Sequence, residues 1–143
     1  MDARLHILTL GVADLERARR FYETGLGWPL HPKSNPQVLF FRLPGLILGL
    51  YDRSALAEDA GFADPGLRDP NAFGGSAMAQ NLPSEQAVRD AMATAIAAGG
   101  RELVAPEKVF WGGFRGYVAD PDGHAWELAY NPGWDFDDAG ALA

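Results

Sequence analysis

One order of structural elements occurs twice along this chain of 143 residues. Each half has a strand pattern, then an amphipathic helix, then two strand patterns joined by a tight turn. The helices are expected to start after Asp14 and Ser84, residue types that favour the N-cap, and the turns contain Gly45 and Gly123. Because one helix leaves a sheet face unburied, the two halves must pack together. The pattern predicts an α+β protein of two tandem βαβββ modules.

The predicted boundaries follow from alternation, caps and turn residues. The first module spans 4–52 and the second 76–131, within a single domain 1–143. A connector, 53–75, contains Pro65, Pro70 and several glycines, and can serve either as a lid over a cleft or as a linker. The tail, 132–143, is expected to lie frayed or draped on the surface. Strands are predicted at 5–12, 38–43, 46–51, 76–82, 116–119 and 124–130.

Composition excludes several classes of function. The net charge is −7 and there is no basic face, which argues against a nucleic-acid partner. The chain has no cysteine, so it has neither disulfides nor thiolate ligands. No segment resembles a signal peptide or is long enough to cross a bilayer, which predicts no membrane association and a cytoplasmic location.

The stretch Asp120-Pro121-Asp122-Gly123-His124-Ala125-Trp126-Glu127-Leu128 combines a tight turn with a strand. Pro121 and Gly123 suit the turn. In the strand, Trp126 and Leu128 alternate with Glu127, so the carboxylate is expected on the face opposite the large apolar residues.

These residues resemble the vicinal-oxygen-chelate superfamily, which includes glyoxalases, extradiol dioxygenases and bleomycin-resistance proteins. The opening resemblance is Gly11-Val12-Ala13-Asp14-Leu15-Glu16 with Phe21-Tyr22 and Leu26-Gly27-Trp28, and the closing one is the 120–128 stretch. The resemblance covers about residues 4 to 131. It implies a glyoxalase-like domain with a cupped mixed sheet and outer helices, and a homodimer. One fold of this kind hosts many chemistries.

In metal-using members of that superfamily, four cleft positions supply the ligands. Carried onto this chain, they fall on Ile7, Gly49, Ala77 and Glu127. A catalytic divalent metal normally needs about three protein ligands, and only Glu127 qualifies. No metal and no other cofactor is therefore expected. The alternative is a divalent metal held by His6, after a register slip in the first strand, or by His124 with Glu127.

The stretch 109–117 is rich in aromatic residues and glycine and can form a cleft wall, or its aromatics can fill the core. Glu127 has three interpretations: it binds ligand, it acts as a general base, or it pairs with Arg115. His31 is interpreted as a surface-loop residue. The ligand-binding residues expected besides Glu127 are Trp111, Phe114, Arg115, Phe40, Tyr51, Thr9 and Asn81.

Three functional hypotheses follow. The first is a protein like those of bleomycin resistance, which binds a small organic molecule in the sheet cleft without a catalytic metal. The second is a metal-dependent glyoxalase-like lyase or isomerase, or a dioxygenase. The third is a metal-free enzyme with Glu127 as its base.

Overall fold

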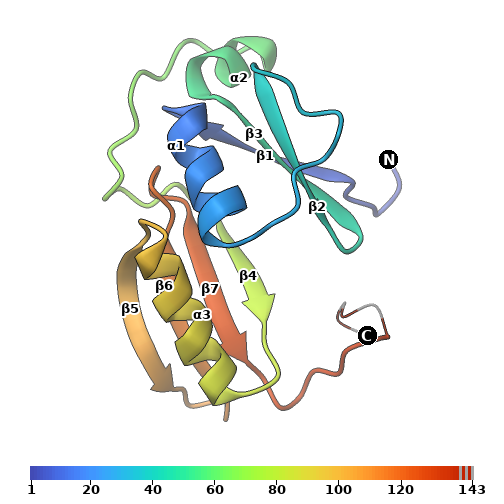
Figure 1. The fold of residues 1–143 in the computed structure, drawn as a ribbon, viewed down its shortest axis with the longest axis vertical. Helices are drawn as coiled ribbons and strands as arrows, with labels where there is room; N and C mark the ends of the chain where they lie inside the picture. The colour runs from blue at the N-terminus through green and yellow to red at the C-terminus, as the bar shows by residue number, and fades with distance from the viewer. Residues whose placement is uncertain (139, 141, 143) are drawn as a thin grey trace.

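The chain forms two separate sheets in the computed structural model, which describes residues 1–138, 140 and 142. Over these residues the strand orders are β1-β3-β2 in the first half and β4-β7-β6-β5 in the second. Each sheet carries a helix on one of its faces (Figure 1). The predicted α+β class with paired mixed sheets is confirmed.

The first module pairs β1 with β3 in parallel and β3 with β2 antiparallel. The side chain of Asp14 caps α1 as predicted, because its Oδ1 accepts the backbone N–H of Arg17 at 2.9 Å. The hairpin between β2 and β3 turns at Gly45, where φ is 71°. The elements are β1 (Ile7–Val12), α1 (Leu15–Arg19), η1 (Arg20–Gly25), β2 (Val38–Leu43) and β3 (Leu46–Asp52).

The second module repeats this plan with one more strand. Its first strand again runs parallel to its last, and the other neighbours are antiparallel. Ser84 caps the helix by accepting the N–H of Ala87, and Gly99, at φ 106°, follows its end. The elements are β4 (Ala77–Asn81), α3 (Glu85–Ala97), β5 (Arg101–Lys108), β6 (Phe114–Ala119) and β7 (Ala125–Tyr130).

Alternation along the strands divides each sheet into a buried and an open face. The buried faces meet the helices and supply most of the core, in which large side chains are less than a tenth exposed. The opposite faces, which we call the concave faces, carry the residues that alternate with this core set. The strand members of the core cluster are Leu10, Val12, Leu39, Phe41, Leu48, Leu50, Phe114, Val118 and Leu128.

The π-helical turn η1 explains how two consecutive aromatics enter the core. The N–H of Leu26 bonds to the carbonyl of Phe21, five residues earlier, at 2.9 Å. This wider turn directs both Phe21 and Tyr22 inward, and neither is more than 1% exposed. The segment ends against α3, because a Cβ added to Gly25 would lie against the side chain of Ala98.

The fourth strand of the two modules is irregular, and it differs between them. Strand β5 has no alternation: it contains Pro106, forms the sheet edge and has register shifts between Glu102 and Val104 and between Val104 and Glu107. Its counterpart in the first module is only a bridge between Leu30 and Phe41. Prolines at 29, 32 and 36 lack the N–H that a full ladder requires.

The 120–124 turn joins the two modules through buried polar groups. Oδ2 of Asp120 accepts the hydroxyl of Tyr22 at 2.7 Å, and that hydroxyl accepts the indole N–H of Trp126 at 3.1 Å. Oδ1 of Asp122 accepts the N–H of Ala13 and a guanidinium N–H of Arg17, both at 2.8 Å. The turn of the second module is therefore fixed to the strand–helix junction of the first.

The connector begins with a short helix, α2 (Arg53–Asp59). Beyond it, Arg68 donates to the carbonyl of Gly123 at 3.1 Å and lies 2.9 Å from Nδ1 of His124. The connector therefore packs against the 120–124 turn, which we call the inter-module turn. Its role as a lid stays a prediction. Part of the predicted tail, residues 139, 141 and 143, lies outside the described residues. No helix in the described ranges is long and apolar enough to span a membrane.

Candidate functional site

Each concave face presents one central row of three residues from neighbouring strands. In the first sheet, Thr9 and Phe40 are the cross-strand partners of Gly49. In the second sheet, Ala79 and Tyr117 are the cross-strand partners of Glu127. The duplication makes these rows equivalent, with Glu127 at the place that Gly49 occupies in the other module.

The row in the first sheet is closed at its centre. A Cβ built on Gly49 would lie 2.9 Å from Oγ1 of Thr9 and 3.5 Å from the ring of Phe40. A side chain at position 49 would therefore require Oγ1 of Thr9 to move, while its contact with Phe40 would be an ordinary van der Waals contact. The two further positions of the expected metal set, Ile7 and Ala77, carry no donor atom, so the residues present do not fit the chelate of metal-using relatives.

The row in the second sheet is polar. Burial, followed by the negative charge of Glu127 and its hydrogen bond, raises the pKa of Tyr117, so its hydroxyl stays protonated near neutral pH and can donate. The guanidinium carbon of Arg115 lies 5.6 Å from the ring centroid of Tyr117. Arg115, Tyr117 and Glu127 share one face of β6 and β7. Tyr117 was not among the expected site residues, although its place opposite Glu127 makes it a neighbour.

The ion pair of Arg115 with Glu127, one of the three interpretations of Glu127, is not formed in the structure. The guanidinium instead donates to Oε1 of Glu107 on β5 at 2.9 Å. Glu127 therefore keeps Tyr117 as its partner on the sheet, and Arg115 with Glu107 forms the rim of the same face.

The other expected site residues are dispersed. Phe114 is 2% exposed and lies under the guanidinium of Arg89, on the helix side, so it is a core residue and not a cleft wall. Trp111 is in the β5–β6 loop, 42% exposed, with its ring folded over Gly113. Tyr51 is half-buried on the concave face of β3, and Asn81 lies at the end of β4.

The histidines proposed as alternative metal ligands do not form a cluster with Glu127. His6 is exposed and precedes β1. His124 is buried, with Nε2 2.9 Å from the carbonyl of Gly11 and Nδ1 2.9 Å from a guanidinium nitrogen of Arg68, so both ring nitrogens already have partners. His31 accepts the backbone N–H of Lys33 in its loop. Within residues 1–138, 140 and 142, no three His, Asp or Glu side chains form a group that could hold a metal ion.

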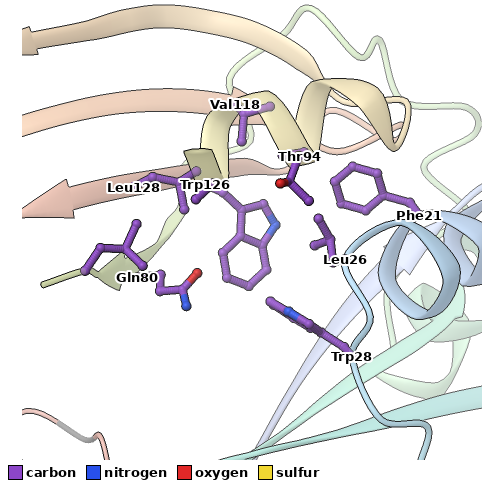
Figure 2. A pocket seen from close by; sticks show the side chains of 11 residues that line it. Phe21, Leu26, Trp28, Gln80, Thr94, Val118, Trp126 and Leu128 are labelled. Atoms are coloured by element: carbon purple, nitrogen blue, oxygen red, sulfur yellow. The ribbon is translucent and has the colours of Figure 1, made fainter. Parts of the chain in front are cut away.

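A cavity of about 210 Å³ lies on the opposite side of the second sheet, between the two modules. We call it the inter-module pocket. Figure 2 shows Trp126 at its centre, with Gln80 on one side and Trp28 and Leu26 on the other. Glu127 is not part of its wall, because it points to the concave face. The lining residues are Phe21, Leu26, Trp28, Gln80, Leu82, Ala91, Thr94, Ala95, Val118, Trp126 and Leu128.

Both modules place their last strand parallel to their first, and the last strand of the second module carries Glu127. The chain belongs to the Glyoxalase/Bleomycin resistance protein/Dioxygenase superfamily, whose family model matches residues 4–128.

Solved structures agree with this assignment. A glyoxalase-related enzyme from Fulvimarina pelagi is 37% identical, with 99% of this chain and 98% of that chain covered and a TM-score of 0.88. A glyoxalase/bleomycin resistance protein/dioxygenase from Nocardioides is 27% identical over 91% of this chain and 84% of that chain, with a TM-score of 0.74. A lactoylglutathione lyase from Agrobacterium tumefaciens, 20% identical over 94% and 98% of the two chains, shares the fold at a TM-score of 0.67. No curated protein matches the chain.

Proposed function

We propose that this chain binds a small organic molecule on its concave faces without a divalent metal at the superfamily's ligand positions. The observation that carries the proposal is which residues occupy those four positions. Three of the four, Ile7, Gly49 and Ala77, have no side-chain donor atom.

The polar row of the second sheet suits direct recognition of an organic ligand. Glu127 offers carboxylate acceptors, Tyr117, whose proton is donated to Glu127, offers its hydroxyl oxygen, and Arg115 adds a cation beside them. Ala79, the third member of the row, has a small and exposed side chain. A ligand with a hydrogen-bond donor or a positive group facing Glu127 fits this arrangement. The homodimer, in which a second copy would supply the other wall of the cleft, stays a prediction that light scattering at micromolar concentration can check.

A second candidate is metal-free catalysis with Glu127 as general base. The contact between Glu127 and Tyr117 favours it, since a base next to a hydroxyl donor can remove one proton while the donor stabilises the resulting charge. The similarity to a protein described as a glyoxalase-related enzyme also supports it. Unchanged turnover in Glu127→Gln would contradict this candidate.

Metal uptake tests the proposal directly. Protein that has never met a chelator is offered one equivalent each of Mn, Fe, Ni, Zn and Co, and we expect less than about 0.1 ion bound per chain, because one carboxylate cannot hold a divalent ion tightly. The melting temperature should also stay unchanged, since an ion that binds the folded chain would raise it. One tightly held ion per chain that disappears in Glu127→Ala would contradict the proposal.

A ligand screen then locates the site. Compounds from a panel of antibiotics and aromatic metabolites, bleomycin included, are selected by thermal shift. The best binder should lose affinity about tenfold or more in Glu127→Gln, because a hydrogen bond to a charged group contributes about 1.5–3 kcal/mol. Glu58→Gln is the control: it removes an exposed carboxylate from α2 and should change affinity less than about threefold. Equal loss in both variants would place the ligand elsewhere.

A further inference from the structure

The inter-module pocket has a chemical character different from that of the concave face. All eleven side chains in its wall are uncharged, and most are apolar. An ion would lose its hydration there without gaining a charged partner, so the pocket selects against charged molecules.

The pocket exists because small side chains of α3 face large side chains of β7 and of the segment 20–28, which contains η1 and the residues after it. Ala91, Thr94 and Ala95 line it from the helix. Opposite them, the rings of Trp28 and Trp126 stand edge to face, with centroids 5.4 Å apart and planes at 80°. The two indoles therefore form a corner of flat apolar surfaces, which suits a planar ring.

Among the described residues, hydrogen bonds within the protein leave two polar groups of the wall for a ligand, the side-chain amide of Gln80 and the indole N–H of Trp28. The indole N–H of Trp126 is already donated to Tyr22, and the hydroxyl of Thr94 is donated to the carbonyl of Asp90 at 2.9 Å. Among the described residues, none bonds to the side-chain amide of Gln80, which Figure 2 shows beside the ring of Trp126. An amide presents one donor and one acceptor side by side.

The volume sets the size of the occupant. An apolar cavity of about 150 Å³ accommodates benzene, so about 210 Å³ fits a molecule of two fused rings. A second cavity of about 270 Å³ shares Trp28, Gln80 and Trp126 with the pocket and extends to Phe136 and Leu142 of the tail. A substituent on the ring can extend from the inter-module pocket into this second cavity.

We propose that the inter-module pocket is a second binding site, which takes a neutral, planar bicyclic heteroaromatic compound. The ring packs in the corner of Trp28 and Trp126, and an adjacent N–H and C=O on its edge pair with the amide of Gln80. The site is separate from the concave face, because Trp126 and Glu127 point to opposite sides of β7, and it does not depend on the function proposed there.

The probe is 2-quinolinone, a neutral bicyclic lactam, titrated into the full chain and followed by the indole N–H resonances in NMR spectra. Trp28 and Trp126 should shift saturably with a dissociation constant below about 1 mM. Trp111 and Trp134, which lie outside the pocket, should not shift. Absence of saturable binding would overturn the proposal.

Two substitutions on α3 form a matched pair. Ala91→Leu puts extra carbons into the pocket and should weaken binding at least about tenfold, because the ring loses its space. Ala93→Leu makes the same change on the exposed side of the helix and should leave the affinity within about twofold. Unchanged affinity in a folded Ala91→Leu protein would overturn the proposal.

A second variant keeps the proposal testable if Ala91→Leu does not fold. Gln80→Leu should weaken 2-quinolinone about tenfold or more, because two neutral hydrogen bonds are lost. It should weaken 1-methyl-2-quinolinone, which keeps the C=O but lacks the N–H, by a smaller factor of about three, the contribution of one neutral hydrogen bond. Glu127→Gln should leave both compounds unaffected. An effect of Glu127→Gln equal to that of Gln80→Leu would assign the probe to the concave face and overturn the second site.

Discussion

Replacing Asp120 by alanine is expected to lower the free energy of unfolding by about 3 kcal/mol, because three buried donors lose their acceptor. Its Oδ2 accepts the hydroxyl of Tyr22, and its Oδ1 accepts the backbone N–H groups of Asp122 and His124 at 2.9 and 2.8 Å. Asp120 is only 3% exposed, so water cannot replace these bonds in the folded chain. Relief from burying a carboxylate offsets part of the loss.

Urea unfolding measures this effect. Asp59→Ala, an aspartate on the exposed end of α2, is the control and should change the free energy of unfolding by less than about 0.5 kcal/mol. The two modules should also separate more readily in Asp120→Ala, since Tyr22 and Asp120 belong to different modules. If Asp120→Ala is no less stable than Asp59→Ala, the buried turn does not hold the modules together.

The same carboxyl group should give a pH signature. Burial raises the pKa of Asp120 above its ordinary value, against the opposing effects of His124 and of the hydrogen bond from Tyr22. The folded chain therefore binds this proton more tightly than the unfolded chain. The stabilisation that this tighter proton binding gives is fully present below the pKa of Asp120 in the unfolded chain. It is lost as the pH rises through the pKa of Asp120 in the folded chain. Asp120→Asn does not titrate, so the stability advantage of the natural chain over this variant should shrink as the pH rises from below the unfolded pKa of Asp120 through its raised folded pKa.

The sequence predicted the fold through features that are local. The caps at Asp14 and Ser84 and the turns at Gly45 and Gly123 depend on a few neighbouring residues, and the alternation around Glu127 depends on the strand period of two. Strand β5 could not be identified in this way, because an edge strand with a proline and register shifts has no clean alternation.

The site was less predictable because it depends on contacts between distant residues. Phe114 looked like a wall residue within an aromatic stretch, but α3 covers it, and only the position of the helix determines that. The partner of Arg115 is Glu107, which comes from the strand that the pattern missed. The inter-module pocket combines η1, α3 and β7, and no single stretch of sequence carries a signal for it.

Replacing Gly123 by alanine should destabilise the chain much more than replacing Gly45. Both glycines have positive φ, 83° and 71°, so alanine at either position costs about 1–2 kcal/mol of backbone strain. Their surroundings differ. A Cβ at Gly45 would meet nothing within 4 Å, whereas one at Gly123 would lie 2.5 Å from the carbonyl oxygen of Pro70 and 2.7 Å from its Cα. Because these are backbone atoms of the connector, relief requires the connector to move.

We therefore expect Gly123→Ala to lose about 3–4 kcal/mol of unfolding free energy and Gly45→Ala about 1–2 kcal/mol, measured by urea unfolding under the same conditions. A second measurement distinguishes displacement of the connector from backbone strain at residue 123. Arg68 is held by Gly123 and His124, so its release should make trypsin cleave after Arg68 faster in Gly123→Ala than in Gly45→Ala. Equal cleavage rates with equal stability losses would mean that the connector does not depend on the inter-module turn, because strain at the two turns would then explain the whole effect.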